Sequence, residues 1–146
     1  MNNPDKQNTV SKDTAQAWTA KWRSRHPKAP RAFLIPAADF VEVLNEIGVL
    51  SDAEAAQAQA RANKLNANVR GYLGIDANSN NEDKLIFVGT EADDQGIYRD
   101  IIDGKVDGKD GQNAKVVGGD NPSSGIYDFT RPCPTFCDDQ SPLNDN

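Results

Sequence analysis

Helix signals and strand signals occupy different parts of this 146-residue chain, and this separation most constrains its fold. In residues 37–48, Phe40, Val43, Leu44 and Ile47 follow the spacing i, i+3, i+4, i+7, which is typical of an amphipathic helix. From Asn68 onward, "VRGYLGID" and "KLIFVGTEAD" are rich in β-branched and aromatic residues, and the turn-forming "ANSNNE" lies between them. A run of helices followed by a run of strands predicts an α+β fold.

Two further helices are predicted in the first half of the chain. Asp13 is a suitable N-cap for "TAQAWTAKWRSR", and Pro27 should end that helix at His26. Ser51 followed three residues later by Glu54 is a capping box, which predicts a third helix over "AEAAQAQARANKL". With "AFLI" at 32–35 as a short strand, we expect an N-terminal helical layer of three helices packed on a small, mainly antiparallel sheet.

The chain length suits one domain with flexible ends. Residues 1–12 are polar and lack periodicity, which predicts a disordered arm. A single α+β domain should span residues 13–130, and residues 131–146 should form a tail that contains prolines and both cysteines. Long Gly/Asp-rich loops are expected within the domain, above all over residues 103–125, with at most a short strand at 114–117.

The net charge of −6 divides unevenly along the chain. Residues 1–35 carry seven bases against two acids, and all the remaining excess of acids lies after residue 35. A basic segment of this kind can dock on an acidic partner or on the protein's own acidic body. The chain lacks a long apolar run, and its N-terminus lacks an apolar signal segment, so we expect a soluble, cytoplasmic protein without a membrane span unless a leader has been removed.

Trp18 and Trp22 lie one helical turn apart among basic residues that include Arg23 and Arg25. One interpretation is a partner-binding face, because tryptophan and arginine are enriched at protein-binding hot spots. The alternative is that the indoles anchor the helix to the core, as large apolar side chains usually do. Nucleic acid is disfavoured as a partner, because the acidic body would repel phosphates.

The segment after residue 75 offers clustered oxygen atoms that could bind a cation. Asp76, Asn78, Asn80 and Asp83 resemble the start of a calcium-binding loop, although Asn81 replaces the glycine and Phe87 stands where a bidentate glutamate belongs. The simpler interpretation is an Asx turn within a β-hairpin. Apart from this weak calcium site, no cofactor is expected.

Cys133 and Cys137, in "RPCPTFCDD", are the only cysteines of the chain. Two ligands do not complete a zinc site, although a metal shared between chains or a reactive thiol at Cys133 remains open. A disulfide is sterically possible, but it would not persist in a reducing cytosol. The interpretation we favour is a stiff, extended tail that Phe136 and Leu143 pin to the body.

No motif in the sequence names a reaction. The single histidine, His26, argues against Ser-His or Cys-His chemistry, and the phosphate-binding glycine motifs are missing. We therefore expect a small non-enzymatic protein-binding or adaptor domain that binds a protein partner or self-associates. The alternatives are an enzyme that uses carboxylates or Cys133, with or without a divalent cation, and a subunit of a larger assembly.

Overall fold

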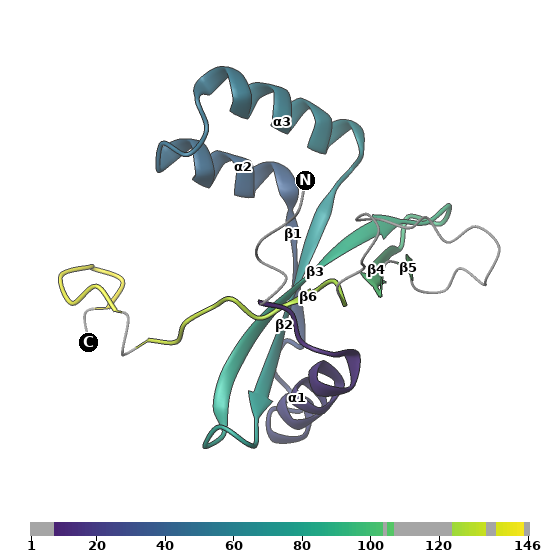
Figure 1. Ribbon diagram of the computed structural model, residues 1–146, viewed down its shortest axis with the longest axis vertical. Coiled ribbons are helices and arrows are strands. Elements are labelled where there is room, and N and C mark those ends of the chain that lie inside the picture. Colours follow the sequence, from purple (N-terminus) through teal and green to yellow (C-terminus); the bar gives the residue numbers. More distant parts are fainter. Residues whose placement is uncertain (1–7, 104, 107–123, 134–136, 145–146) are drawn as a thin grey trace.

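The computed structural model describes residues 8–103, 105–106, 124–133 and 137–144 of the chain (Figure 1). Three helices and a mainly antiparallel, open sheet confirm the α+β class. In chain order the elements are α1 (Lys12–Arg25), β1 (Ala32–Pro36), α2 (Ala37–Glu46), α3 (Asp52–Lys64), β2 (Asn68–Asp76), β3 (Glu82–Ala92), β4 (Tyr98–Ile102), β5 (Lys105–Val106) and β6 (Ile126–Tyr127).

The sheet runs in the order β1-β2-β3-β4-β5, and β6 pairs with β3 beside β4. Its centre is the hairpin of β2 and β3, where Tyr72 lies opposite Ile86 and Gly74 lies opposite Lys84. The predicted hairpin, the strand near residues 32–35 and the strands at "GIYRDII" and "GIYDFT" are therefore confirmed. The expected short strand at 114–117 lies outside the described residues.

Helix α1 lies across one face of the sheet, which we call the α1 face. Side chains alternate between the two faces of a strand, so Gly74, Ile86 and Val88 belong to this face. Trp18, only 8% exposed, packs here beside Gly74, and together with Ala15 it joins Ile86, Val88 and Ile126 in the hydrophobic core. The absence of a side chain at Gly74 is what lets the helix backbone come this close.

The start of the ordered chain differs from the sequence prediction. The N-cap of α1 is Ser11 rather than Asp13, and its side chain accepts a hydrogen bond from the backbone N–H of Thr14 at 3.1 Å. Residues 8–10, which belong to the expected disordered arm, run beside β6: Val10 N donates to Ile126 O at 3.0 Å. Residues 1–7 lie outside the described part of the chain.

Helices α2 and α3 form a hairpin that is inserted between the neighbouring strands β1 and β2. It begins and ends at one point of the sheet, because Ala37 N donates to Ala67 O at 2.9 Å. Gly48, with φ of +77°, ends α2, and the predicted capping box of Ser51 and Glu54 starts α3. Figure 1 shows the hairpin extending away from the sheet, so α1 alone among the described helices covers a sheet face.

None of the described helices is both long enough and apolar enough to cross a membrane.

Candidate functional site

The two tryptophans anchor α1 rather than forming an exposed pair. Trp18 is buried against the sheet, and the Lys84 ammonium lies 5.3 Å from the centre of its ring. Trp22 is half-buried: its indole N–H donates to Pro30 O at 3.1 Å, and its ring lies 4.1 Å from that of His26. The core-anchor interpretation therefore fits Trp18, and Trp22 fixes the loop that follows the helix.

The arginines of the predicted partner-binding face are exposed on α1. Arg25 donates to the side-chain oxygen of Asn81 at 3.3 Å, and Lys21 donates to the same oxygen at 2.6 Å. Arg23 makes no side-chain hydrogen bond with the residues that the structure describes. Within these residues, none of the bases of 12–31 forms an ion pair, so the basic segment packs on the protein's own body through Ala15 and Trp18 and not through charge pairing with its acids.

The proposed calcium loop forms a tight turn of the β2–β3 hairpin. The Asp76 carboxylate accepts a hydrogen bond from Asn78 N at 2.9 Å, which is an Asx turn. This bond, with further donors from Ser79 and Trp18, lowers the pKa of Asp76. Asn80 adopts a positive φ in the turn, and Asp83, paired with Ile75, lies on the face opposite to Asp76. The two carboxylates therefore do not converge, and a calcium site here stays a prediction.

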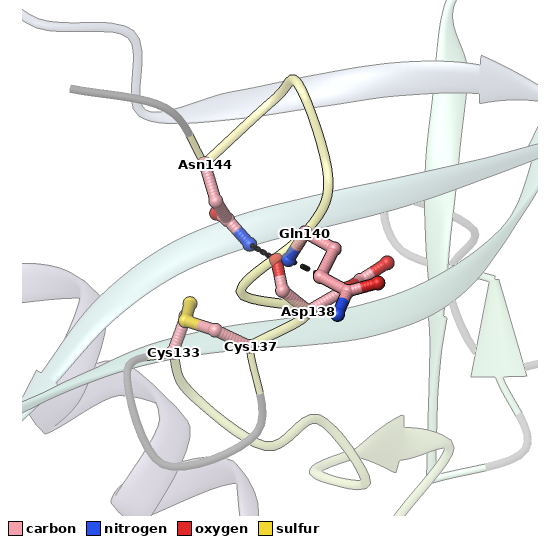
Figure 2. The surroundings of a disulfide bond; sticks show 5 residues. All are labelled: Cys133, Cys137, Asp138, Gln140 and Asn144. Atoms are coloured by element: carbon pink, nitrogen blue, oxygen red, sulfur yellow. Dashed lines mark hydrogen bonds between the residues drawn. A yellow bond between two sulfur atoms is a disulfide. The ribbon is translucent and has the colours of Figure 1, made fainter.

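Cys133 and Cys137 are joined by a disulfide, with their Cα atoms 5.1 Å apart (Figure 2). The prediction that Leu143 pins the tail to the body is wrong, because this side chain is 93% exposed. Phe136, the other predicted anchor, lies outside the described residues. With both sulfurs bonded, Cys133 offers no thiolate for a nucleophile or a metal ligand. Disulfides persist in oxidising compartments, so this disulfide conflicts with the cytoplasmic location expected from the N-terminus.

Beyond the disulfide, the tail is held by local bonds around Asp138. Its carboxylate accepts from Gln140 N at 3.0 Å, and its carbonyl accepts from the Asn144 side chain at 2.7 Å (Figure 2). The disulfide and these two bonds stiffen the tail internally.

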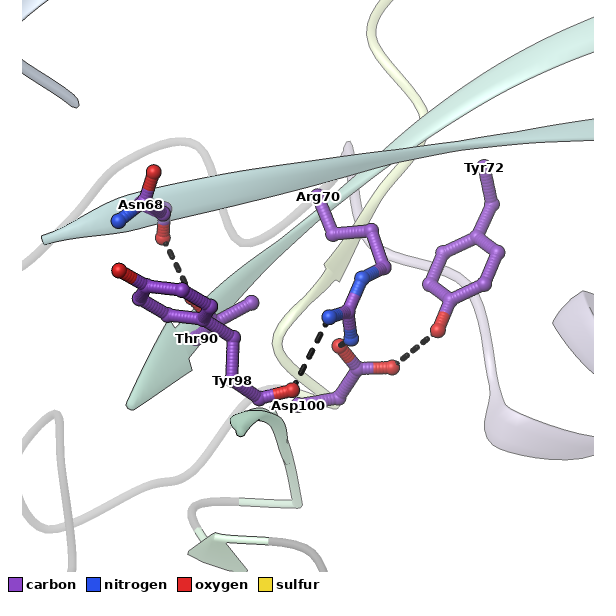
Figure 3. A network of polar contacts seen from close by, with 6 residues as sticks. All are labelled: Asn68, Arg70, Tyr72, Thr90, Tyr98 and Asp100. Atoms are coloured by element: carbon purple, nitrogen blue, oxygen red, sulfur yellow. Dashed lines mark hydrogen bonds and ion pairs between the residues drawn. The ribbon is translucent and has the colours of Figure 1, made fainter. Parts of the chain in front are cut away.

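A buried polar cluster lies on the α1 face at the middle of the sheet (Figure 3). The Asp100 carboxylate, 9% exposed, accepts from the Arg70 guanidinium on one oxygen and from the Tyr72 hydroxyl on the other. A second Arg70 nitrogen donates to Tyr98 O at 3.0 Å. Burial, and then the bond to Asp100, raise the pKa of Tyr72 to about 12. The cluster thus holds β4 to β2 across the intervening β3.

Sequence reasoning missed this cluster, which borders a small cavity between α1 and the sheet. The cavity measures about 270 Å³, with Ile86, Val88, Ile102 and Ile126 among its apolar lining and the exposed Lys12 and Arg23 at its rim. This volume is just below the roughly 300–1,000 Å³ typical of small-molecule sites. Tyr72 and Asp100, which reach it, are hydrogen-bonded to each other.

Five exposed apolar side chains lie on α2 and just after its end. Phe40, Val43, Leu44 and Ile47, with Val49 just beyond, are between 36% and 66% exposed, and we call these five side chains the α2 surface. None of the residues of α2 is buried. The spacing that predicts an amphipathic helix is therefore present, but the described residues cover the face it defines only in part.

Helix α3 packs against a different side of α2. Gln59 donates to Ala38 O and to the Glu42 carboxylate, both at 3.4 Å, and Asn45 donates to Asp52 at 3.0 Å. At 3.6 residues per turn, residues 38, 42 and 45 lie roughly 150° around the helix from the centre of the α2 surface. The buried residues of α3 are the alanines 55 and 62, which allow a close approach without large side chains.

The α2 surface continues onto the sheet face opposite to α1. The Phe40 ring meets the Phe87 ring edge-on, with centroids 5.9 Å apart, and Phe87 stacks on Phe129 at 5.3 Å. Phe33 shares this face, because it lies opposite Gly71, which in turn lies opposite Phe87. Phe33 and Phe129 are 52% and 55% exposed, so the apolar region spans both the helix and the sheet.

No protein-family model, curated protein or solved structure matches this chain. The candidate site therefore rests on the geometry described above.

Proposed function

We propose that this chain is a non-enzymatic protein-binding domain and that its partner, a different protein, covers the α2 surface. The observation that supports this most directly is the exposure of Phe40, Val43, Leu44 and Ile47, the four residues whose spacing marks the apolar face of α2. A helix that has such a face normally buries it against another element. Here α3 occupies a different side, and Phe40 contacts Phe87 on the sheet, whereas Val43 and Ile47 stay more than half exposed.

The size of the α2 surface is consistent with a binding role. Taking roughly 150–200 Å² for a fully exposed side chain of this size, the exposed parts of the five residues amount to roughly 400–500 Å². Contiguous patches of about 300–600 Å² are the largest found on typical monomers and are often functional. At about 25 cal/mol per Å², covering the patch would contribute roughly 10 kcal/mol before the cost of association.

The polar groups of the described residues support a binding role over the enzyme alternative. Asp100, Tyr72 and Arg70 satisfy one another, and Cys133 is bonded to Cys137.

A photo-crosslinking residue placed at Val43 in cells of the source organism tests the proposal. We expect a discrete covalent adduct with one protein, and we expect Ile47→Ser to remove it. Both positions are more than half exposed, so these changes should alter stability by no more than about 0.5 kcal/mol.

The same crosslinker at Gln57, an exposed residue of α3, is the matched control and should give no adduct. The adduct's partner, once sequenced and purified, should bind the wild-type chain and lose affinity for Val43→Ser. Adducts of equal yield at Val43 and Gln57 would contradict the proposal.

A further inference from the structure

The α2 surface is bordered by negative charge. Residues 37–54, which form α2 and the start of α3, contain five acids and no Lys, Arg or His; the acids are Asp39, Glu42, Glu46, Asp52 and Glu54. Ion pairs between described residues lie elsewhere, for example at Arg70–Asp100 and Arg99–Asp93. None of the five acids forms an ion pair with a described residue.

Three of these acids form a stripe along one flank of the α2 surface. Asp39, Glu42 and Glu46 follow the spacing i, i+3, i+7, so they lie on one side of the helix. With about 100° between successive residues, the stripe runs beside Val43, whereas α3 packs beyond its other edge. Glu42 accepts one amide hydrogen bond from Gln59, and Asp39 and Glu46 are exposed.

A partner that covers this surface must place its own groups beside the acidic stripe. An acidic or uncharged partner would leave the carboxylates repelled or partly desolvated, whereas lysine or arginine would compensate them. An anionic membrane surface is disfavoured on the same ground, because helices that lie on membranes carry basic residues beside their apolar face. The α2 surface is therefore suited to a cationic protein segment.

The shape of the surface indicates the form of that segment. Phe40, Val43, Leu44 and Ile47 span about two turns of helix, and Phe87 with Phe129 provides a second apolar wall on the sheet. Amphipathic helices bind such surfaces through residues spaced i, i+3, i+4, i+7. We propose that the α2 surface binds a basic amphipathic helix of another protein; this inference rests on the protein-binding function proposed above.

Two synthetic 18-residue helical peptides test the inference with the full-length protein. Both carry leucines at i, i+3, i+4, i+7, and they differ only in having lysine or glutamate along one flank of the leucine face. By fluorescence anisotropy at low salt, the lysine peptide should bind at least about tenfold more tightly, a difference of about 1.4 kcal/mol. Its affinity should fall several-fold between 50 and 300 mM NaCl, because exposed pairs are screened.

Paired variants separate the charge from the apolar contact. Glu42→Lys with Glu46→Lys should reverse the preference between the two peptides, whereas Val43→Ser with Ile47→Ser should weaken both. The control is Asp94→Lys, a charge reversal at one exposed residue of the β3–β4 turn, which should leave the preference unchanged.

The outcomes distinguish the inference from the proposed function. If both peptides bind equally, without salt dependence, and the serine variants still abolish binding, the inference is overturned and the protein-binding function stands. If neither peptide binds, the inference is overturned, and the Val43 crosslink decides on the protein-binding function. A dimer seen by sedimentation without peptide, and lost in the serine variants, would show that a second copy occupies the surface and would overturn the inference of a heterologous basic helix.

Discussion

Replacing Gly74 with alanine should push α1 away from the sheet. A Cβ atom at this position would lie 2.9 Å from the Cβ of Trp18 and 3.3 Å from its carbonyl carbon. Neither atom can move by a change of rotamer, because one belongs to the helix backbone and the other is bonded directly to it. The clash can be relieved only by a shift of the helix or of β2.

The expected loss of stability follows from what that shift disturbs. Trp18 and Ala15 would lose part of their packing against Ile86 and Val88, and overpacking of this kind costs about 1–3 kcal/mol. The reduced freedom of the unfolded chain offsets about 0.4–1 kcal/mol of this cost. We expect Gly74→Ala to destabilise the fold by about 1–2 kcal/mol and to lower the midpoint of thermal unfolding by roughly 2–8 °C.

Thermal and urea unfolding, followed by circular dichroism and tryptophan fluorescence, would measure this loss. The matched control is Gly89→Ala on β3, where the nearest atom to the new Cβ is Ile101 Cδ1 at an ordinary 3.8 Å. This control should be neutral or slightly stabilising. Gly71→Ala should fall between the two, because its new Cβ would meet only the ends of the Leu85 and Phe87 side chains, at 3.3 Å. Equal stability of the Gly74 and Gly89 variants would refute the reasoning.

Two further predictions concern the polar cluster and the tail. The pKa of Tyr72 is about 12 in the folded state and about 10 in the unfolded chain. The stability that the Tyr72 proton contributes is therefore complete below about pH 10 and is lost as the pH rises to 12. Absorbance at 295 nm should show one of the three tyrosines ionising near pH 12, and Tyr72→Phe should remove that step; three ordinary titrations would contradict the assignment. Reduction of the Cys133–Cys137 disulfide should change the unfolding midpoint of the α+β domain by less than about 1 °C, because the ring lies in a tail that is held by local bonds and Leu143 beyond it is 93% exposed. The roughly 2 kcal/mol that closing so short a ring contributes then acts on the tail and not on the domain. A shift of about 5 °C or more in a scan with and without reductant would show that the tail packs on the domain.

Local signals in the sequence predicted most of the secondary structure. The capping box of Ser51 and Glu54 forms as expected, and Gly48 ends α2 with a positive φ. These features depend on a few consecutive residues, so the sequence carries them directly. The N-cap of α1 was placed two residues too late, because Ser11 and Asp13 are both good caps and only the tertiary structure decides between them.

The candidate site could be predicted only in part, because periodicity identifies an apolar face but not what covers it. The spacing of Phe40, Val43, Leu44 and Ile47 was evident, and the expected packing of this helix on the sheet was the natural inference. Helix α3 packs on the side of α2 opposite to this apolar face. This packing depends on the alanines 55 and 62 and on the hydrogen bonds of Gln59, which the periodicity of α2 does not reveal.

The polar cluster was beyond prediction for a different reason. Arg70 and Tyr72 meet Asp100 only because β2, β3 and β4 pair in one register, and a shift by one residue would turn these side chains to opposite faces. The strand "YRDII" contains two adjacent charged residues, Arg99 and Asp100. Because successive side chains point to opposite faces, one of the two faces α1, and this was the available signal that it needs a partner.

The insertion of the α2–α3 hairpin at a single point of the sheet has a consequence for how such a chain can diversify. Its first and last backbone groups, Ala37 N and Ala67 O, are only 2.9 Å apart. A tight β-turn could close the same gap, because β1 and β2 are already antiparallel neighbours. The hairpin can therefore be replaced while the rest of the sheet stays the same. Proteins that share this fold could acquire new partners by changes in residues 38–66 that leave the core under α1 unaltered.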